Sequence, residues 1–337
     1  MTNRPLPAPL TDGLQLPLIV APMFLVSGVD LVAAACLNGA IGAVPSLNAR
    51  SPDILESWLA DLTTRLDGAR GAGRPAAPWA VNLVVHSTNK RLAPDLDLCV
   101  KYRAPLIITA LGGPKAVVDT VHSYGGLVFA DVNTPAYARK AAESGVDGLV
   151  LVCSGAGGHT GQMTAPAFVA SVRSFFDGII VVAGGLTSGQ HLRAVQAMGA
   201  DLGYMGTRFI ATDESLAQPD YKQMVVDSQF SDIICTNAIT GAYANKLRPS
   251  LVAAGLDPDN LKARSKFDMT TAAEDQKAWR DLWSAGHSVE QVKAIRSTAE
   301  AIADIGRDYD AVLAAEMNDP WRRVRQATGQ VLKKATA

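Results

Sequence analysis

Short apolar runs recur along the chain, and a longer amphipathic stretch follows each of them. The runs are rich in Val, Ile and Leu and do not alternate between polar and apolar residues. Continuous apolarity is typical of strands that are covered on both faces, as in a parallel sheet flanked by helices. The pattern predicts eight strands, at residues 18–23, 41–45, 79–84, 105–111, 126–131, 148–153, 178–184 and 202–206.

The amphipathic stretches carry signals for the start and end of helices. Ser51 and Thr134 each precede a proline, and Ser188 precedes a further amphipathic stretch. A hydroxyl side chain at the cap, with proline at the first helical position, favours helix initiation. Gly145 and Gly199 stand where two of these helices are expected to end.

Eight strand–helix units over about 210 residues indicate an α/β protein with a (β/α)8 TIM barrel, for which ~250 residues is typical. A doubly wound open sheet is the alternative. Its usual sign is G-x-G-x-x-G just after the first strand. Here the first strand ends APMFLVSG, which has no glycine cluster, and the later GAGGHTG lacks the dinucleotide spacing. The barrel is therefore the expected architecture.

The pattern changes after the last expected strand. Residues 213–285 mix polar and apolar positions without a clear strand, and we expect helical excursions that form a lid or substrate segment over the barrel mouth. Lys246 and Arg248 are expected to be solvated residues of this lid. Two closing helices are expected at 288–305 and 317–334, so that residues 1–212 and 286–337 together form the barrel domain.

Composition narrows the class of protein. Hydrophobic residues make up 48% and charged residues 19% of the 337 residues, and the formal net charge is −1. A partner nucleic acid is not expected, because its binding normally needs a concentrated basic face. No apolar run reaches the roughly 20 residues of a membrane span, and the N-terminal prolines do not suit a signal peptide. We expect a soluble, cytoplasmic protein that could form a homo-oligomer.

The four cysteines are widely spaced and include no C-x-x-C pair: Cys36, Cys99, Cys153 and Cys235. This spacing favours buried thiols in a reducing compartment over a disulfide framework or a zinc site. No metal site is expected.

Glycines gather at the ends of the last two strands, where a barrel places its active site. Ala183 and Gly184 end the seventh run and Gly185 follows it, while Gly206 ends the eighth run and Thr207 follows it. Glycine lets backbone N–H groups approach a phosphate closely, and barrel phosphate sites use the loops after these two strands. These glycines could instead only make tight turns, but their pairing at the two strands favours a phosphate site.

A histidine lies in the glycine-rich loop CSGAGGHTG, which follows the sixth run. His159 is therefore expected to be presented at the barrel mouth. A histidine titrates near neutrality, so it can transfer a proton or donate a hydrogen bond to a developing anion. The alternative is a structural histidine that fixes a flexible loop.

Polar and apolar groups at other strand ends complete the expected site. Asn82 lies in the third run, where its amide could bond a polar heterocycle or simply be satisfied locally. Pro22 and Met23 end the first run and could form an apolar platform. Asp131 ends the fifth run and could accept a hydrogen bond at the mouth or cap the following helix. Cys153 has no charged neighbour in the sequence, so an inert buried thiol is expected.

Taken together, APM at the first strand, VNL at the third, the AGGH loop, AGG at the seventh and MGTRF at the eighth resemble the nitronate monooxygenase family. The resemblance covers roughly residues 15–245. It implies a (β/α)8 flavoprotein that holds FMN non-covalently and oxidises alkyl nitronates with O2 to carbonyl compounds and nitrite. Flavin-dependent enoyl-ACP reductases and some NADH:quinone reductases share these signatures, so an NAD(P)H oxidoreductase is the alternative.

The resemblance also implies roles for individual residues. Gly184, Gly185, Gly206 and Thr207 would hold the FMN phosphate, Met23 and Asn82 would face the isoalloxazine, and His159 would be catalytic. His159 would remove the α-proton of a neutral nitroalkane and hydrogen-bond the nitro or nitronate oxygens. The remaining residues assigned to the cofactor site are Ala21, Pro22, Asp131, Gly158 and Ala183.

Overall fold

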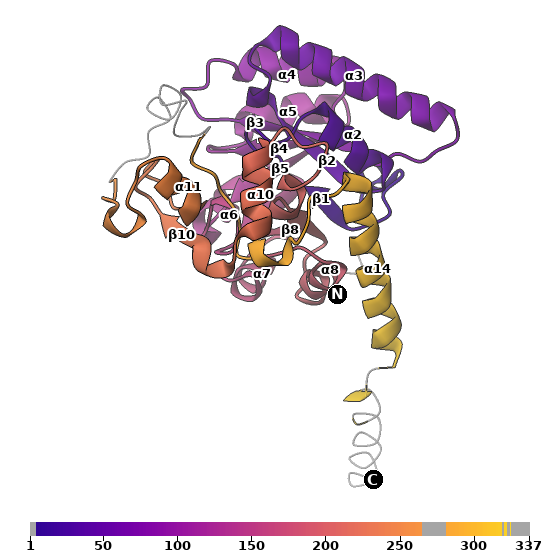
Figure 1. Cartoon of the computed structure of the whole chain (residues 1–337). Helices are drawn as coiled ribbons and strands as arrows, with labels where there is room; N and C mark the ends of the chain where they lie inside the picture. Colours follow the sequence, from indigo (N-terminus) through magenta and orange to yellow (C-terminus); the bar gives the residue numbers. More distant parts are fainter. Residues whose placement is uncertain (1–4, 265–280, 319, 322–323, 325–337) are drawn as a thin grey trace.

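The computed structural model describes residues 5–264, 281–318, 320–321 and 324 of the chain. A parallel sheet closes into a barrel, in which β1 pairs with both β2 and β9. This closure confirms the predicted barrel and rules out the open sheet, and helices surround the barrel (Figure 1). Its strands are β1 (Leu18–Val20), β2 (Ile41–Pro45), β3 (Trp79–Val84), β4 (Leu106–Ala110), β5 (Leu127–Val132), β6 (Gly148–Val152), β8 (Ile179–Ala183) and β9 (Leu202–Met205).

All eight predicted strands are present, and β2 and β3 have the predicted bounds. Two buried clusters explain why the runs are apolar throughout. Ala80 and Val150 belong to the cluster that fills the barrel, whereas Val81 and Leu151 belong to the cluster shared with the surrounding helices. Successive side chains on a strand point to opposite faces, so both faces of each strand must be apolar.

The predicted caps start the helices as expected. The side chains of Ser51, Thr134 and Ser188 each accept a hydrogen bond from a backbone N–H in the first turn of the helix that follows. The helices that follow the barrel strands are α2 (Val29–Leu37), α3 (Pro52–Gly71), α4 (Leu92–Lys101), α5 (Lys115–Ser123), α6 (Pro135–Glu143), α7 (Ala165–Arg173), α8 (Gly189–Ala197) and α9 (Thr207–Ile210).

Residues 213–285 contain strands as well as helices, so the expectation of a purely helical segment is wrong. A three-stranded sheet has the order β10-β11-β7, with antiparallel pairing throughout. The strand β11 contains the polar residues Asn245 and Lys246, so the hydrophobic pattern did not indicate a strand there. Both residues are buried in the structure. The elements are β7 (Gly158–His159), α10 (Pro219–Asp227), η2 (Phe230–Asp232), β10 (Ile233–Thr236), β11 (Ala244–Leu247), α11 (Arg248–Ala253) and η3 (Pro258–Asn260).

The chain ends cover the barrel in two places. Leu10, in the short helix α1 (Ala8–Thr11), packs into the cluster inside the barrel. The helix predicted at 288–305 begins later than expected. A single turn, η4 (Val289–Gln291), comes first. The helix α14 (Thr298–Met317) then begins after a capping box at Ser297. The second predicted closing helix lies largely outside the described residues.

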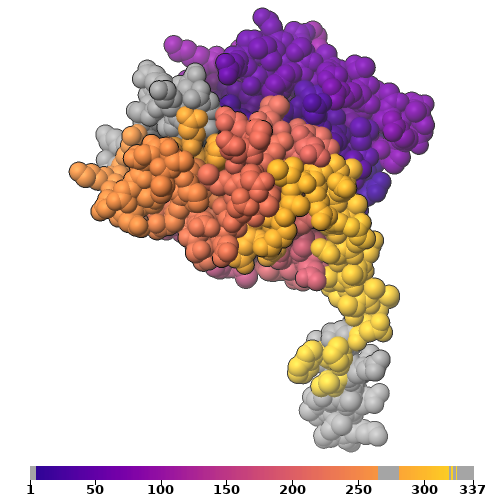
Figure 2. Space-filling model, in the orientation of Figure 1, coloured from indigo at the N-terminus to yellow at the C-terminus, as the bar shows by residue number. Residues whose placement is uncertain are grey.

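Helix α14 packs on α8 and extends beyond the barrel (Figure 1). The space-filling view shows the salmon, orange and gold parts of the chain, which follow the barrel strands, as one continuous surface (Figure 2). Among the described residues, the helices are all too short or too polar to cross a membrane.

Gly189 lets the backbones of α8 and α14 approach each other closely. A Cβ at this position would overlap the backbone of Ile305 and Tyr309. We expect Gly189→Ala to lower the free energy of unfolding by about 1–3 kcal/mol, since the two helices would have to separate.

Gly68→Ala is the matched control for this prediction, because Gly68 lies in α3 and a Cβ there would meet no atom within 4 Å. Alanine should stabilise that exposed helical position by about 0.5–1 kcal/mol. Urea denaturation of both variants checks the prediction, and equal stabilities would contradict the packing described.

Candidate active site

The loop after β8 has a backbone that requires glycine. Gly184 has φ +123° and Gly185 has φ +74°, a region that side-chain-bearing residues rarely adopt. The Gly185 N–H donates to the carbonyl of Gly155, 3.2 Å away. A Cβ on Gly185 would meet no atom within 4 Å, so one side of this loop is open. Ala183, the last residue of β8, is buried inside the barrel.

Gly206 stands at the N-cap of α9 with φ −110°, so positive φ is not the reason for glycine there. A Cβ at Gly206 would lie 3.4 Å from Met23 Sδ and 3.6 Å from Ala21 Cβ. The ends of β1 and β9 are therefore adjacent, and Ala21 N–H donates to the Met205 carbonyl at 2.9 Å.

The segment after residue 281 joins these loops, which the sequence did not predict. Gly286 N–H donates to Thr207 Oγ1 at 2.9 Å. His287 N–H donates to the Gly155 carbonyl at 3.0 Å, so this carbonyl accepts from both His287 and Gly185. A Cβ on Gly286 would lie 2.6 Å from Gly155 O. The loops after β6, β8 and β9 therefore converge.

His159 lies in a strand, not in an irregular loop as predicted. It pairs with Ala244 of β11, and Gly158, with φ +68°, pairs with Asn245. The residue as a whole is partly buried, and its Nε2 is fully buried. Burial, and then the charge of Lys246, lower the pKa of His159 from 6.5 to about 4. The imidazole is therefore neutral at pH 7 and is a weak base.

Asn245 attaches the three-stranded sheet to the loop after β6, and sequence reasoning missed it. It is fully buried. Its Nδ2 donates to the carbonyls of Ser154 and Ala156, at 3.0 and 2.7 Å. Buried amides that satisfy backbone carbonyls fix a loop in one conformation. Asn245 thus holds the loop that leads to His159.

Three polar side chains face the barrel interior near its mouth. Asn82 is 9% exposed, and its Nδ2 donates to the Ile108 carbonyl at 3.0 Å. Asp131 Oδ1 and the hydroxyl of Tyr204 are buried and have no hydrogen-bond partner among the described residues. Thr134, not Asp131, caps α6. The Asp131 carboxyl therefore takes no part in capping α6 and faces the barrel mouth.

Burial controls the protonation of Asp131 and Tyr204. It raises the pKa of Asp131 from 3.8 to about 7. Burial, and then the charge of Asp131, raise the pKa of Tyr204 well above its usual value. Tyr204, which sequence reasoning also missed, is therefore a neutral donor beside a carboxyl that changes charge near neutral pH.

The β1 end is fixed by local hydrogen bonds. Met23 N–H donates to Ser27 Oγ at 3.0 Å, and the Met23 carbonyl accepts from Asn48 Nδ2 at 3.0 Å. Pro22 and Met23 are partly buried beside them. The predicted platform is therefore held against the end of β9.

Several histidine and cysteine side chains away from the barrel mouth, and Cys153 beside it, serve local structure. His122 Nε2 lies 2.9 Å from Asp147 Oδ2, and His191 Nδ1 accepts from Thr187 N–H at 3.1 Å. Burial raises the pKa of Cys153 to about 12, so its thiol is inert as predicted. Cys235 is exposed, so the prediction of four buried thiols is wrong for this residue.

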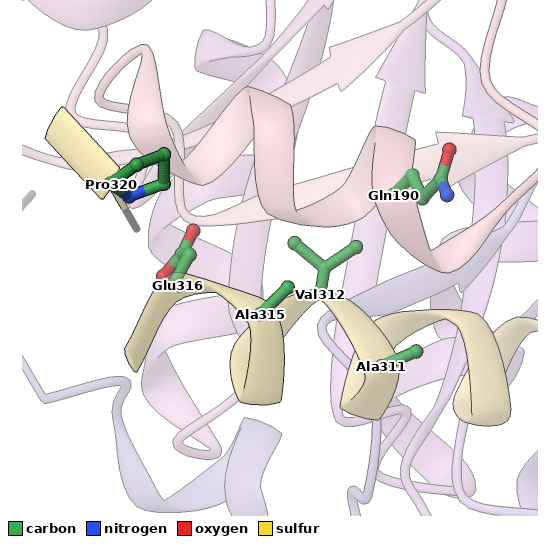
Figure 3. Close-up of a pocket in the computed structure, with 6 residues that line it drawn as sticks. All are labelled: Gln190, Ala311, Val312, Ala315, Glu316 and Pro320. Atoms are coloured by element: carbon green, nitrogen blue, oxygen red, sulfur yellow. The ribbon is translucent and has the colours of Figure 1, made fainter. Parts of the chain in front are cut away.

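A depression of about 400 Å³ lies outside the barrel between α8 and α14 (Figure 3). Its lining residues come from these helices and from Pro320, and none comes from a strand end. It is therefore separate from the site at the mouth. Within the described part of the chain, no group of three or more His, Cys, Asp or Glu side chains is placed to hold a metal ion.

The structure is a closed barrel with glycine loops and a histidine at its mouth, an arrangement typical of barrel enzymes that bind a phosphate-bearing ligand. The family model described as nitronate monooxygenase matches residues 75–308. This match covers more than half of the chain, so the chain belongs to the nitronate monooxygenase family. Membership makes it a flavin-dependent oxidoreductase that acts on a small-molecule substrate.

The curated relatives of this chain are named for different reactions. A nitronate monooxygenase of Neurospora crassa is 28% identical, over 62% of this chain and 63% of its own length. A 5-hydroxy-7a-methyl-1-oxo-octahydro-1H-indene-4-carboxyl-CoA dehydrogenase of Rhodococcus jostii is 25% identical, over 84% of this chain and 82% of its own length. Two other matches span 56% and 67% of the relative's length.

Solved structures share the fold. FabK from Thermotoga maritima has a TM-score of 0.77 at 23% identity and covers 92% of this chain and 97% of its own. A nitroalkane oxidase from Streptomyces ansochromogenes has a TM-score of 0.76 at 22% identity and covers 91% of this chain and 99% of its own.

The raised pKa of Asp131 gives the stability a predictable pH dependence. The folded protein holds this proton up to about pH 7, whereas an unfolded chain loses it near 3.9. The contribution of Asp131 is therefore fully present below pH 4 and is lost as the pH rises through 7.

Asp131→Asn should thus be more stable relative to wild type at pH 8 than at pH 5. Melting temperatures of the flavin-free proteins at both pH values measure this difference. Asp119→Asn, which changes an exposed acid on α5, is the control. An Asp131→Asn difference that does not change with pH would show that the carboxyl is ionised throughout.

Proposed function

We propose that this chain binds FMN and uses it to oxidise alkyl nitronates with O2, giving carbonyl compounds and nitrite. One observation carries the proposal: the glycine loops after β6, β8 and β9 converge at the barrel mouth, and β7 brings His159 to the same loops. The similarity to nitronate monooxygenases supports the substrate class.

The residues at the mouth fit a flavin with one phosphate. Gly184 and Gly185 have a backbone conformation that residues with side chains rarely adopt, and there is open space beside Gly185. The hydroxyl of Thr207 accepts from Gly286 and keeps its own proton to donate. No pyrophosphate fingerprint follows a strand. These groups would hold the phosphate of FMN, and FAD would be left with an unmatched second phosphate.

The remaining residues would surround the ring system. Pro22 and Met23 supply an apolar edge, and Asn82 lies in the polar layer below it. The hydroxyl of Tyr204 and Asp131 Oδ1 are buried atoms that a polar heterocycle could satisfy. A bound flavin would supply the electron acceptor and the reaction with O2.

His159 would act as a hydrogen-bonding group more than as a base. With a pKa of about 4, its imidazole is neutral at pH 7 and holds a proton poorly. A neutral imidazole can still donate its N–H to a nitronate oxygen. Nitronates have already lost the α-proton, so they need no base. We therefore expect nitronates to be better substrates than neutral nitroalkanes.

Gly185→Ala tests the phosphate site. The added methyl group has room within the protein, but it would enter the space assigned to the phosphate. Gly73→Ala is the matched control, because Gly73 has φ +75° and equally open surroundings in the turn after α3. Both variants should lose about 1–2 kcal/mol of stability from the left-handed backbone.

Only Gly185→Ala should be purified without flavin. Mass analysis of the chromophore released from each protein measures this and should identify FMN. Normal flavin content in Gly185→Ala would remove Gly185 from the site, and release of FAD would contradict the FMN assignment.

His159→Asn tests the catalytic assignment. We expect the variant to keep its flavin and to lose about 10- to 100-fold in kcat/KM for propyl-1-nitronate, the value of one hydrogen bond to a charged group. Nitrite release and oxygen uptake provide the measurement. Unchanged kinetics on the nitronate would show that His159 does not contact the substrate.

A second candidate is dehydrogenation of a hydroxylated CoA thioester. The similarity to the Rhodococcus jostii dehydrogenase favours it, since this match covers more of the chain than the Neurospora crassa match does. Absence of nitrite release from any nitronate, in a protein that carries flavin, would favour this second function.

A further inference from the structure

Lys246 is buried, although the sequence predicts a solvated lid residue. It is 2% exposed, whereas Arg248 reaches solvent and pairs with Asp259. Lys246 Nζ donates to the Leu282 carbonyl at 2.9 Å. Burial of an ammonium group is costly in free energy. A position that served packing alone would therefore be filled better by an apolar side chain.

The strand register places Lys246 beside His159. His159 pairs with Ala244, and Lys246 lies two residues further along β11 on the same face of the sheet. Such diagonal neighbours lie about 7–8 Å apart at Cα, within reach of a long side chain. The backbone of the β10-β11-β7 sheet therefore fixes the two side chains as neighbours.

Ionisable side chains lie on β10, on β11 and on the neighbouring loops. The charge of one of them, Lys246, lowers the pKa of His159, and this effect comes after that of burial itself. Ile234 and Thr236 of β10 share the face of His159 and do not titrate. Other ionisable residues near the three-stranded sheet are Cys235 in β10, Tyr243 just before β11, and Asp281 and His287 in the segment that packs on the loop after β6.

We propose that Lys246 is a positioning residue of the candidate active site, whose buried ammonium group holds the His159 imidazole in the uncharged form that hydrogen-bonds an anionic substrate. Protonation of His159 would place two cations side by side in a region screened from water, where charges interact strongly. The inference rests on the proposed function only for the identity of the anion, a nitronate.

An NMR titration of the histidine side chains of the purified holoprotein tests the proposal without any substrate. The His159→Asn variant identifies the His159 signal. In the wild type we expect His159 to stay neutral down to pH 5. In Lys246→Met, its titration midpoint should rise by up to about one pH unit, because the charge of Lys246 is the smaller of the two causes that lower it, after burial.

Two further variants separate charge from structure. Lys246→Arg keeps the charge and should keep the low midpoint. Lys222→Met removes a lysine on α10 that also donates to a backbone carbonyl, Asp213 O, and should leave His159 unchanged. An unchanged midpoint in folded Lys246→Met would overturn the proposal. If that variant does not fold, a wild-type midpoint near 6.5 would overturn it instead.

Kinetics then connect the charge to the reaction. In Lys246→Met, the pH profile of kcat/KM for propyl-1-nitronate should shift to higher pH by the same amount as the NMR midpoint. A shifted midpoint in a protein that oxidises no nitronate would support the role of Lys246 and contradict the proposed function. A pH profile that does not shift, in an active variant, would overturn the role of Lys246.

Discussion

The site depends on the two hydrogen bonds that the buried Asn245 amide donates to the carbonyls of Ser154 and Ala156. They tie the β10-β11-β7 sheet to the loop after β6. An unmet carbonyl in this dry region would cost about 1–3 kcal/mol, so the attachment is strongly specified. In the same loop, the Gly155 carbonyl accepts hydrogen bonds from the backbone N–H groups of Gly185 and His287. One amide therefore sets the position of His159 relative to the glycines after β8.

The barrel could be predicted from sequence because its strands are buried on both faces. A residue such as Val81 packs against helices while its neighbour Ala80 fills the barrel, and both must be apolar. The sheet over the mouth gave no such signal. β7 has two residues, and β11 buries Asn245 and Lys246 through hydrogen bonds instead of apolar contacts. Periodicity cannot reveal a strand whose buried residues are polar.

The candidate site was predictable where strand ends alone determine position. Gly184, Gly185 and His159 follow strands whose ends meet at the mouth, so their proximity follows from the barrel. Tyr204 and Gly286 did not stand out. Tyr204 looked like one residue of an apolar strand, and Gly286 reaches the site only because residues 281–287 fold back onto Gly155. Contacts between segments so distant in sequence cannot be read from local pattern.

The proposed function requires the barrel mouth to bind an anionic substrate beside a flavin that accepts its electrons. Burial lowers the pKa of Lys246 to about 8, so this residue still carries positive charge at pH 7. At that pH His159 is neutral, and Asp131 holds its proton up to about pH 7. Anaerobic stopped-flow mixing of the flavin-loaded protein with each electron donor tests this account most directly. Propyl-1-nitronate should bleach the flavin rapidly, and NADH or NADPH should do so slowly. Rapid bleaching by NADH, with no response to propyl-1-nitronate or propyl-2-nitronate, would contradict it.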